Sequence, residues 1–463
     1  MVQTFRGTLT AAYSKRHIAH RFDVPVGATR LSIVLEHDPR RSAGAEHDNQ
    51  VSLSLFDPNG FRGARHNHPD QTVSLSAVHA TPGYLPGPIA SGSWEVVLDT
   101  HRILPPGALE YRITVRTDTD RTDEQVPPDL RPRAKAPRGP GWYRGDLHSH
   151  TWHSDGAWDV PDLVRFARKH RLDFLALTDH NTVSGLAQLD ALGDDDLLTI
   201  GGMEATTYHG HALLLGTRRW HDWRVVNGHT TVDLARSALE QGILFVIAHP
   251  LSPGDPVCTG CRWEVGELMP GIAPAVEIWN GIWQPYNEAG LQLYYRWLNE
   301  GHRLVATAGT DNHGRQPLEV TGAAFNVVYA TELSELAILN AVRQGRLYLS
   351  GGPDLRLTAT DDRGSEVMMG GTIGASAALR VRAAWHHTSA TDRVRLIVNG
   401  NLYEELSAAE SGEKAWNLAG GTMHWFLVEL RDTAGYMRAI TNPIFVDRGD
   451  RCGRSLGNGR TAQ

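Results

Sequence analysis

The chain has 463 residues, of which 41% are hydrophobic and 21% are charged, with a formal net charge of −7. This length predicts two or three domains, and the acidic balance argues against a nucleic-acid partner. No apolar run approaches the length of a membrane span, and the first residues lack the apolar segment of a signal peptide. We therefore expect no membrane partner and a cytoplasmic location, with secretion left open.

Residues 1–117 have the pattern of an all-β domain. Apolar and polar residues alternate in four stretches, which lie at 30–38, 51–57, 93–99 and 109–117. Short strands separated by glycine and proline turns are typical of a β-sandwich or jelly roll. The histidines of this region follow no common pattern, and we expect them on its surface: His17, His20, His66 and His68.

Residues 118–141 are rich in proline and charge and contain almost nothing to bury, so we expect a linker there. From 142 to 351 short apolar runs alternate with amphipathic stretches. One of these is 159–170, which predicts a helix with Asp159 as its N-cap. This alternation indicates βα units around a largely parallel sheet, either an α/β barrel or a doubly wound sheet.

Residues 352–448 return to a β pattern, with a hairpin signal at Asn399-Gly400, and predict a second sandwich. Residues 449–463 have the composition of a flexible tail. Cys258 and Cys261 form the one C-x-x-C pair, and no second pair is present to complete a four-cysteine zinc site. A local disulfide and two loop thiols both stay open.

Five apolar runs of the central region end in, or are followed by, histidine or acidic residues. The chain has 23 histidines, so position rather than abundance must decide their meaning. The carboxyl ends of parallel strands meet at one edge of a barrel, where active sites form. Imidazole and carboxylate together bind zinc, manganese or iron, so these ends predict a site for two or more metal ions. The residues are His148, His150, Asp155, His180, Glu204, His211, His249, Asp311 and His313.

In their order along the chain, these residues resemble the motifs of the polymerase and histidinol phosphatase (PHP) superfamily of metal-dependent hydrolases. The flanking β regions and the segment 201–216 resemble the branch that includes carbaryl hydrolases, the CehA/McbA type. The resemblance implies a distorted (β/α)7 barrel at 142–351, an α/β fold flanked by N- and C-terminal β-sandwich domains.

The resemblance also implies two to three divalent cations per chain: zinc, manganese or iron. The first ion would take His148, His150, Glu204 and Asp311. Glu204 would bridge to a second ion, which His211 and His249 complete. A third ion would take Asp155, His180 and His313. His153 competes with Asp155 and is expected to lie behind the ligands or on the surface, and His209 competes with His211.

Such a cluster predicts hydrolysis, because bound cations lower the pKa of water and polarise the scissile bond. His180 and His209 are candidates for the acid that protonates the leaving group. Phosphoesters are the expected small-molecule substrates, and carboxyl or carbamate esters are the alternative. Arg262 and Arg315 would contact a phosphate, whereas Trp283 would belong to an aromatic pocket for an aryl ester.

A different class of function is a non-catalytic scaffold, whose β-sandwiches bind a partner. Loss of ligands would indicate it, but all nine expected residues are present. Asp179, next to His180, is expected to orient a metal-bound histidine or to cap a strand end. The natural substrate, the metal and the oligomeric state stay open.

Overall fold

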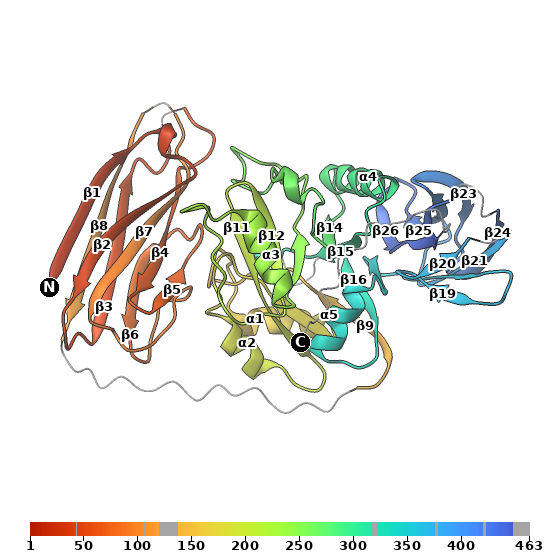
Figure 1. Cartoon of the computed structure of the whole chain (residues 1–463), viewed down its shortest axis with the longest axis horizontal. Helices are drawn as coiled ribbons and strands as arrows, with labels where there is room; N and C mark the ends of the chain where they lie inside the picture. The colour runs from red at the N-terminus through yellow and green to blue at the C-terminus, as the bar shows by residue number, and fades with distance from the viewer. Residues whose placement is uncertain are drawn as a thin grey trace, which may run out of the picture.

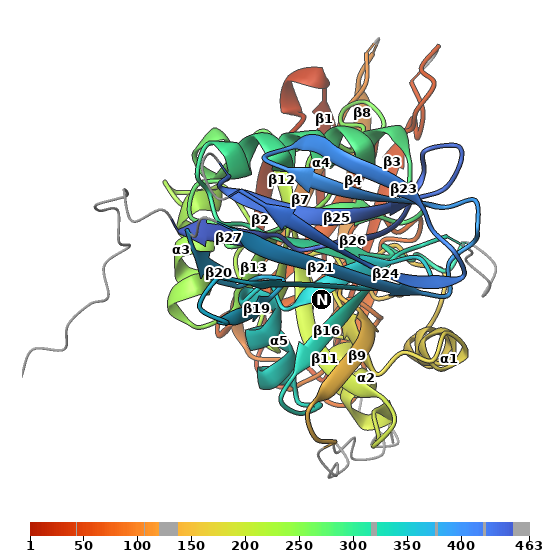
Figure 2. The ribbon, with the colours of Figure 1, turned by 90° about the vertical axis from the view of Figure 1, so that its right-hand side faces the viewer.

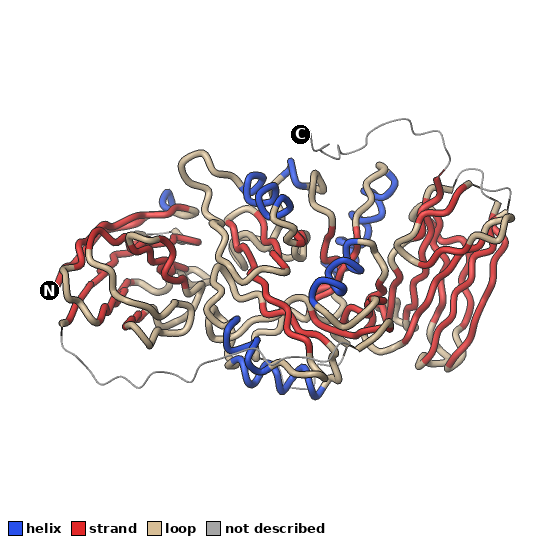
Figure 3. The backbone as a smooth tube through the Cα atoms, turned by 60° about the horizontal axis from the view of Figure 1, so that its bottom comes forward, coloured by secondary structure: helices blue, strands red, loops and turns tan. Residues whose placement is uncertain are grey.

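The computed structural model describes residues 1–42, 44–105, 107–119, 138–315, 322–375, 378–419 and 423–447. Most of the expected linker and all of the expected tail lie outside the described residues. Three regions follow one another along the long axis of the molecule (Figure 1). The helices gather in the middle region, with strands dominating both ends (Figure 3).

The N-terminal region is a sandwich of two antiparallel four-stranded sheets, with strand orders β1-β8-β3-β6 and β2-β7-β4-β5. Its alternating apolar residues face inward, so that Leu31 and Ile33 are fully buried between the sheets. A short 3-10 helix, η1 (Ala11–Tyr13), follows the first strand. The strands are β1 (Val2–Leu9), β2 (Arg16–Val24), β3 (Arg30–Asp38), β4 (Gln50–Asp57), β5 (Gly60–Ala64), β6 (Thr72–Ser76), β7 (Gly92–Arg102) and β8 (Leu109–Asp118).

The central region is a mixed α/β unit with a buried sheet and five short helices among its described residues. Its strands are β9 (Gly141–Asp146), β10 (Phe174–Leu177), β11 (Leu198–Thr207), β12 (Gly210–Leu215), β13 (Leu244–Ile247), β14 (Ala275–Asn280), β15 (Val305–Gly309), β16 (Phe325–Ala330) and β17 (Leu347–Ser350). Its helices are α1 (Val160–Lys169), α2 (Leu186–Leu192), α3 (Thr231–Glu240), α4 (Pro285–Asn299) and α5 (Glu335–Arg343), with a 3-10 turn η2 (Gly266–Leu268).

Helix α1 illustrates how local sequence sets these elements. The side chain of Asp159 accepts a hydrogen bond from the Asp162 backbone N–H at 2.7 Å, as the N-cap prediction requires. Pro161 occupies the first turn, where its missing N–H costs nothing. Leu163 and Phe166 are buried on one face, against strand β10 and helix α2.

The strand pairing does not show the closed barrel that the resemblance implies. The hydrogen-bonded path β15-β14-β13-β12-β11-β10-β9-β16-β17 is open, with β15 at its edge. Four pairs are parallel (β9–β10, β10–β11, β13–β14 and β14–β15), whereas β11–β12, β12–β13 and β9–β16 are antiparallel. A two-residue turn, Tyr208-His209, joins β11 to β12, and so short a connection permits only antiparallel pairing.

The edge strand β15 nevertheless approaches β9 through the residues that follow each strand. The Asp311 backbone N–H donates to the His148 carbonyl at 2.9 Å, and the His150 N–H donates to the Asn312 carbonyl at 3.0 Å. These hydrogen bonds bring the segments after β9 and β15 side by side. They fix the backbone at the place where four of the expected ligands lie.

The C-terminal region continues the central sheet instead of forming a separate layer, because β26 pairs with β17 across the expected domain boundary. Strands β25, β22 and β23 extend this sheet, and β19-β18-β21-β24 form the facing one (Figure 2). The hairpin predicted at Asn399-Gly400 joins β22 to β23. The strands are β18 (Asp354–Thr360), β19 (Glu366–Met368), β20 (Thr372–Gly374), β21 (Leu379–His386), β22 (Arg393–Val398), β23 (Asn401–Ser407), β24 (Ser411–Leu418), β25 (Trp425–Arg431), β26 (Met437–Thr441) and β27 (Ile444–Asp447). No helix in the described part of the chain is long and apolar enough to cross a bilayer.

Candidate metal centre

The nine expected ligands meet at one end of the central sheet. His148 and His150 follow β9, His180 follows β10, and His249 follows β13. The remaining five lie in β11, in β12, after β15 and in the loop before α1: Glu204, His211, Asp311, His313 and Asp155. Most of the nine are buried, and the most exposed side chains are those of Asp311 and His313, at 22% and 21%. The cluster therefore opens on the side of these two residues.

Glu204 is the central residue of the cluster, and its two carboxylate oxygens face different histidines. Oε1 lies 3.0 Å from His211 Nδ1 and 3.3 Å from His249 Nε2. Oε2 lies 3.3 Å from His148 Nε2 and 2.9 Å from His180 Nδ1. A carboxylate placed in this way can bridge two cations a few ångströms apart.

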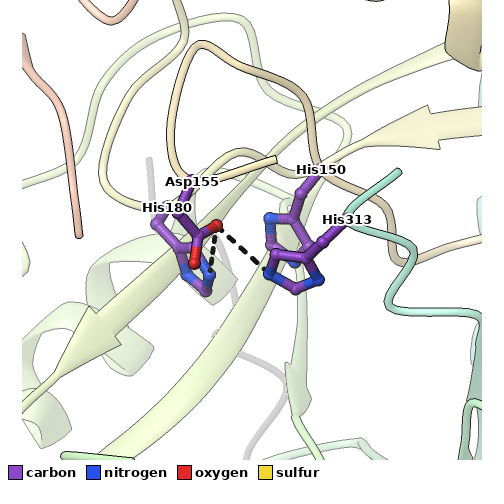
Figure 4. A group of neighbouring side chains, drawn as sticks. All are labelled: His150, Asp155, His180 and His313. Atoms are coloured by element: carbon purple, nitrogen blue, oxygen red, sulfur yellow. Dashed lines mark ion pairs between the residues drawn. The ribbon is translucent and has the colours of Figure 1, made fainter. Parts of the chain in front are cut away.

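A second group of ligands surrounds Asp155, whose Oδ1 lies 3.1 Å from His313 Nε2 and 3.5 Å from His180 Nε2 (Figure 4). His150 stacks on the rings of both histidines, with centroids 4.2 Å from His180 and 4.3 Å from His313. One ligand atom from each of the four residues lies within 4.8 Å of the others. His150, expected at the first ion, is thus also within reach of the third, and Asp311 Oδ1 lies 2.9 Å from its Nε2.

The donor atoms fit cations better than they fit one another. His150 Nε2, Asp155 Oδ1, Glu204 Oε1 and Asp311 Oδ1 are buried and make no hydrogen bond among the described residues. Each nevertheless lies within 3.5 Å of another donor atom of the cluster. Buried polar atoms without hydrogen bonds are costly, and they are uncommon in folded proteins. Nitrogen and carboxylate donors converging without hydrogen-bond geometry are suited to zinc, manganese or iron.

The outward-facing nitrogens of the histidines are held by acceptors that the sequence reasoning missed. His148 Nδ1 donates to Glu277 Oε2 at 2.9 Å. His211 Nε2 donates to the Thr259 carbonyl and His249 Nδ1 to the Cys261 carbonyl, both at 3.2 Å. Such partners fix ring orientation and raise the basicity of a ligating histidine. The sequence carries one signal for Glu277, because a glutamate inside the apolar run 275–279 is a buried charge that needs a partner.

The carboxylates of the cluster are held in their ionised form. Burial raises the pKa of Asp155, but the charges of His313 and His180 outweigh it and keep that pKa well below its usual range. Burial also raises the pKa values of Glu204 and Asp311, but the surrounding histidines outweigh it, so both pKa values lie well below their usual range. Burial lowers the pKa of His313, yet Asp155 and Asp311 raise it to about 10. Negative ligands are therefore available throughout the neutral range.

The backbone at two of these residues is strained. His249 has φ +26° and Asp311 has φ +50°, in the left-handed region that residues other than glycine seldom adopt. Such conformations cost of order 1–3 kcal/mol each and cluster at functional sites. Here the strain turns both side chains from the ends of their strands into the cluster.

The structure does not bring the other predicted site residues together with the cluster, except Arg315. His209 lies in the β11–β12 turn with its side chain 48% exposed, and it pairs with Glu264 at 3.1 Å instead of facing the ligands. Arg262 is exposed. Arg315 is at the rim, where its Nη2 donates to the Asp155 carbonyl at 2.9 Å.

Trp283 is a core residue rather than a wall of a pocket. It is 8% exposed and packs edge-on against Trp279, with ring centroids 5.0 Å apart. The Arg431 guanidinium lies over its ring at 5.8 Å from the centroid. Aromatic residues give the same sequence signal in a core and in a binding pocket, so the contact of Trp283 with substrate stays a prediction.

Two neighbours of the candidate ligands, Asp179 and His153, hydrogen-bond to residues outside the cluster. Asp179 accepts hydrogen bonds from the Thr151 backbone N–H at 2.8 Å and from the Ser154 hydroxyl at 2.7 Å, so it caps the turn after His150 and orients no histidine. His153 faces away from the cluster, with its Nδ1 2.7 Å from Ser184 Oγ.

The expectation that the N-terminal histidines lie on the surface is wrong for two of the four named residues, His17 and His66. His66 is 7% exposed, and the side chain of His17 is also 7% exposed and pairs with Asp99 at 2.7 Å. His20 is half-buried against Tyr111. His68 is also partly exposed, and its ring hydrogen-bonds to the Asp70 backbone. The expectation failed at His17 and His66 because residues of the central region, Tyr208 and His180, pack against them.

Cys258 and Cys261 form a disulfide in the loop that follows β13. The same loop carries the Thr259 and Cys261 carbonyls that hold His211 and His249. The disulfide is one of the two states that the sequence left open. The loop that it closes therefore holds the rings of two candidate ligands through hydrogen bonds.

No family model matches the chain, and no curated protein matches it in sequence. Among solved structures, a two-domain protein from Bacteroides vulgatus, described as containing a predicted PHP-like metal-dependent phosphoesterase, is 16% identical. The match covers 66% of this chain and 96% of that one, with a TM-score of 0.38. A putative metal-dependent phosphoesterase from Bifidobacterium adolescentis is 18% identical over 39% of this chain and 91% of that one, with a TM-score of 0.29. An amidohydrolase from Chromobacterium violaceum is 17% identical over 36% and 87%, with a TM-score of 0.28. Similarities this low carry no argument about function, which rests on the residues of the cluster.

Proposed function

We propose that this chain is a metal-dependent hydrolase of phosphoesters, of the PHP type and with two or three divalent cations. The observation that carries the proposal is the position of Glu204. One of its oxygens faces His211 and His249, and the other faces His148 and His150, the two histidines expected at the first ion. The four histidines and this carboxylate offer donors on both sides of a bridge, which is how a hydrolytic two-metal site is built.

Cations bound there would supply Lewis acidity and lower the pKa of a water molecule. The chain itself supplies the positions. Glu277 and the carbonyls of Thr259 and Cys261 hold the histidine rings in place, so that their nitrogens need not reorganise when a cation binds. Asp155, His180 and His313 would hold the third cation on the side nearest Arg315.

Arg315 favours a phosphoester over a carboxyl or carbamate ester. Its guanidinium is 63% exposed beside Asp155, at the open side of the cluster, and a guanidinium binds phosphate oxygens through paired hydrogen bonds. The aromatic wall expected for an aryl ester is not available from Trp283, which lies in the core. The ligand set itself serves both substrate classes.

The test is metal analysis of protein purified without chelator, followed by assays with p-nitrophenyl phosphate, bis-p-nitrophenyl phosphate and 1-naphthyl acetate. We expect at least one tightly bound cation per chain and faster turnover of a phosphoester than of the acetate. Arg315→Ala should raise KM for the phosphoester about tenfold, in line with loss of one charged hydrogen bond, while Arg262→Ala should leave it unchanged. Metal content well below one ion per chain, with no gain on adding manganese or zinc, would contradict the proposal.

A further inference from the structure

The N-terminal sandwich is fixed directly against the loops that leave the metal centre. The Gly83 N–H donates to Ser184 Oγ at 3.0 Å, and Thr182 Oγ1 donates to the Gly83 carbonyl at 2.7 Å. Arg65 Nη2 donates to the Trp152 carbonyl at 3.3 Å. The two central loops involved begin within two residues of candidate ligands. The sandwich is therefore placed to contribute side chains to the site.

His66, in the loop after β5, is the residue of the sandwich that reaches the cluster. Its ring lies between two others, with centroids 4.5 Å from His101 and 4.7 Å from His180. It is 7% exposed, and His180 in turn lies beside Asp155, with 3.5 Å between Nε2 and Oδ1. His66 therefore borders the Asp155–His180 side of the metal centre without being part of the expected ligand set.

The hydrogen bonds of His66 determine which of its nitrogens carries the proton. Its Nε2 lies 3.4 Å from Gln50 Nε2, which can only donate, so the histidine nitrogen accepts. The proton of the neutral ring is then on Nδ1. That atom is buried and has no hydrogen-bond partner within the described ranges. A buried N–H without an acceptor is unfavourable, and it is satisfied when an acceptor binds beside it.

We infer that His66 is a substrate-binding residue, whose Nδ1–H donates a hydrogen bond to an oxygen of the phosphoester held at the Asp155–His180 side of the cluster. The inference rests on the proposed function. A phosphoester offers only acceptor oxygens to this position, and a neutral N–H complements them without adding a charge. The N-terminal sandwich is then a wall of the substrate site.

The test compares manganese-loaded wild type with His66→Ala, His66→Leu and His66→Asn, using the phosphoester that wild type turns over fastest. Inorganic phosphate binding, measured by calorimetry, and metal content are read in parallel. Removing one preorganised donor should lower kcat/KM about 100-fold and weaken phosphate binding about tenfold, with metal content unchanged. His66→Asn keeps an N–H close to the Nδ1 position and should stay within about tenfold of wild type.

His68→Ala is the matched control, since His68 is in the same loop and, among the described residues, its side chain hydrogen-bonds to the backbone of Asp70. It should behave as wild type. His66→Leu preserves bulk without a donor, so it separates lost packing from a lost hydrogen bond if His66→Ala does not fold.

Unchanged phosphate affinity and kcat/KM in both apolar variants would overturn the inference, and so would loss of a metal ion, which would make His66 a ligand. Failure of the proposed function looks different. Wild type would then turn over no phosphoester, while the phosphate calorimetry would still report on His66.

Discussion

Glu277 offers the sharpest test of how the cluster is held together. It is 1% exposed, and it accepts hydrogen bonds from two buried donors, His148 Nδ1 at 2.9 Å and Asn280 Nδ2 at 2.7 Å. Glu277→Gln leaves one acceptor oxygen for these two donors. Asn280 cannot rotate its amide to compensate, because the same nitrogen also donates to Asp311 Oδ2 at 3.1 Å. One buried donor then stays unpaired.

An unpaired buried donor costs about 1–3 kcal/mol. At about 1.4 kcal/mol per factor of ten, this is a loss of roughly 5- to 100-fold in cation affinity, and the loss of an acceptor behind a ligating histidine is known to cost about 10- to 100-fold. Removal of metal with a chelator and titration with manganese or zinc in a calorimeter measures it. Glu267→Gln, at an exposed position, is the control and should bind as wild type. Wild-type affinity for every cation in Glu277→Gln would refute the reasoning.

Three further predictions follow from the geometry. His148→Ala should lose bound metal and hydrolysis together, whereas His153→Ala should retain both, because the ring of His153 faces Ser184. Elemental analysis and a phosphoester assay measure this, and equal losses in the two variants would contradict the ligand assignment. His209→Ala should leave kcat within about twofold, since the ring is exposed and pairs with Glu264, and a large fall in kcat would restore it as a catalytic residue. Burial lowers the pKa of His101 to about 3, below its unfolded value of 6.5. As the pH falls below 6.5, the unfolded state takes up a proton that the folded state does not, so the fold loses stability. Because of this residue, urea unfolding of metal-free protein should give a free energy of unfolding about 2 kcal/mol lower at pH 5 than at pH 7. His101→Phe should reduce this difference, and an equal difference in the variant and the wild type would disprove the prediction.

The convergence of most candidate ligands could be predicted because their positions depend on local sequence. A buried strand ends, and the polar residues that follow it must lie at the sheet edge, whatever the rest of the fold does. His148, His180, His249 and Asp311 were found in this way. Glu204 and His211 lie within their strands, and their motif order along the chain identified them instead.

What the sequence could not predict depends on contacts between distant segments. His66 gives no local signal, because its burial arises only when the N-terminal sandwich meets the loop carrying His180, more than 100 residues later. The mixed direction of the central strands could not be predicted for a related reason. Whether β11 is followed by a helix or by a tight turn at Tyr208-His209 decides parallel or antiparallel pairing, and both preserve the same apolar runs.

The ladder between β17 and β26 has a consequence for how this protein can be divided. Tyr348, Leu349 and Ser350 pair with Thr441, Ile440 and Ala439, so the last strand of the central region relies on a segment about 90 residues further along. A truncation at Gly351 would leave Leu347–Ser350 as a bare strand edge of apolar character, the kind of surface on which chains associate into aggregates. The C-terminal strands therefore cover the edge of the central sheet, and a shortened chain that stays in solution would have to retain at least β25 and β26, or carry charged residues along that edge.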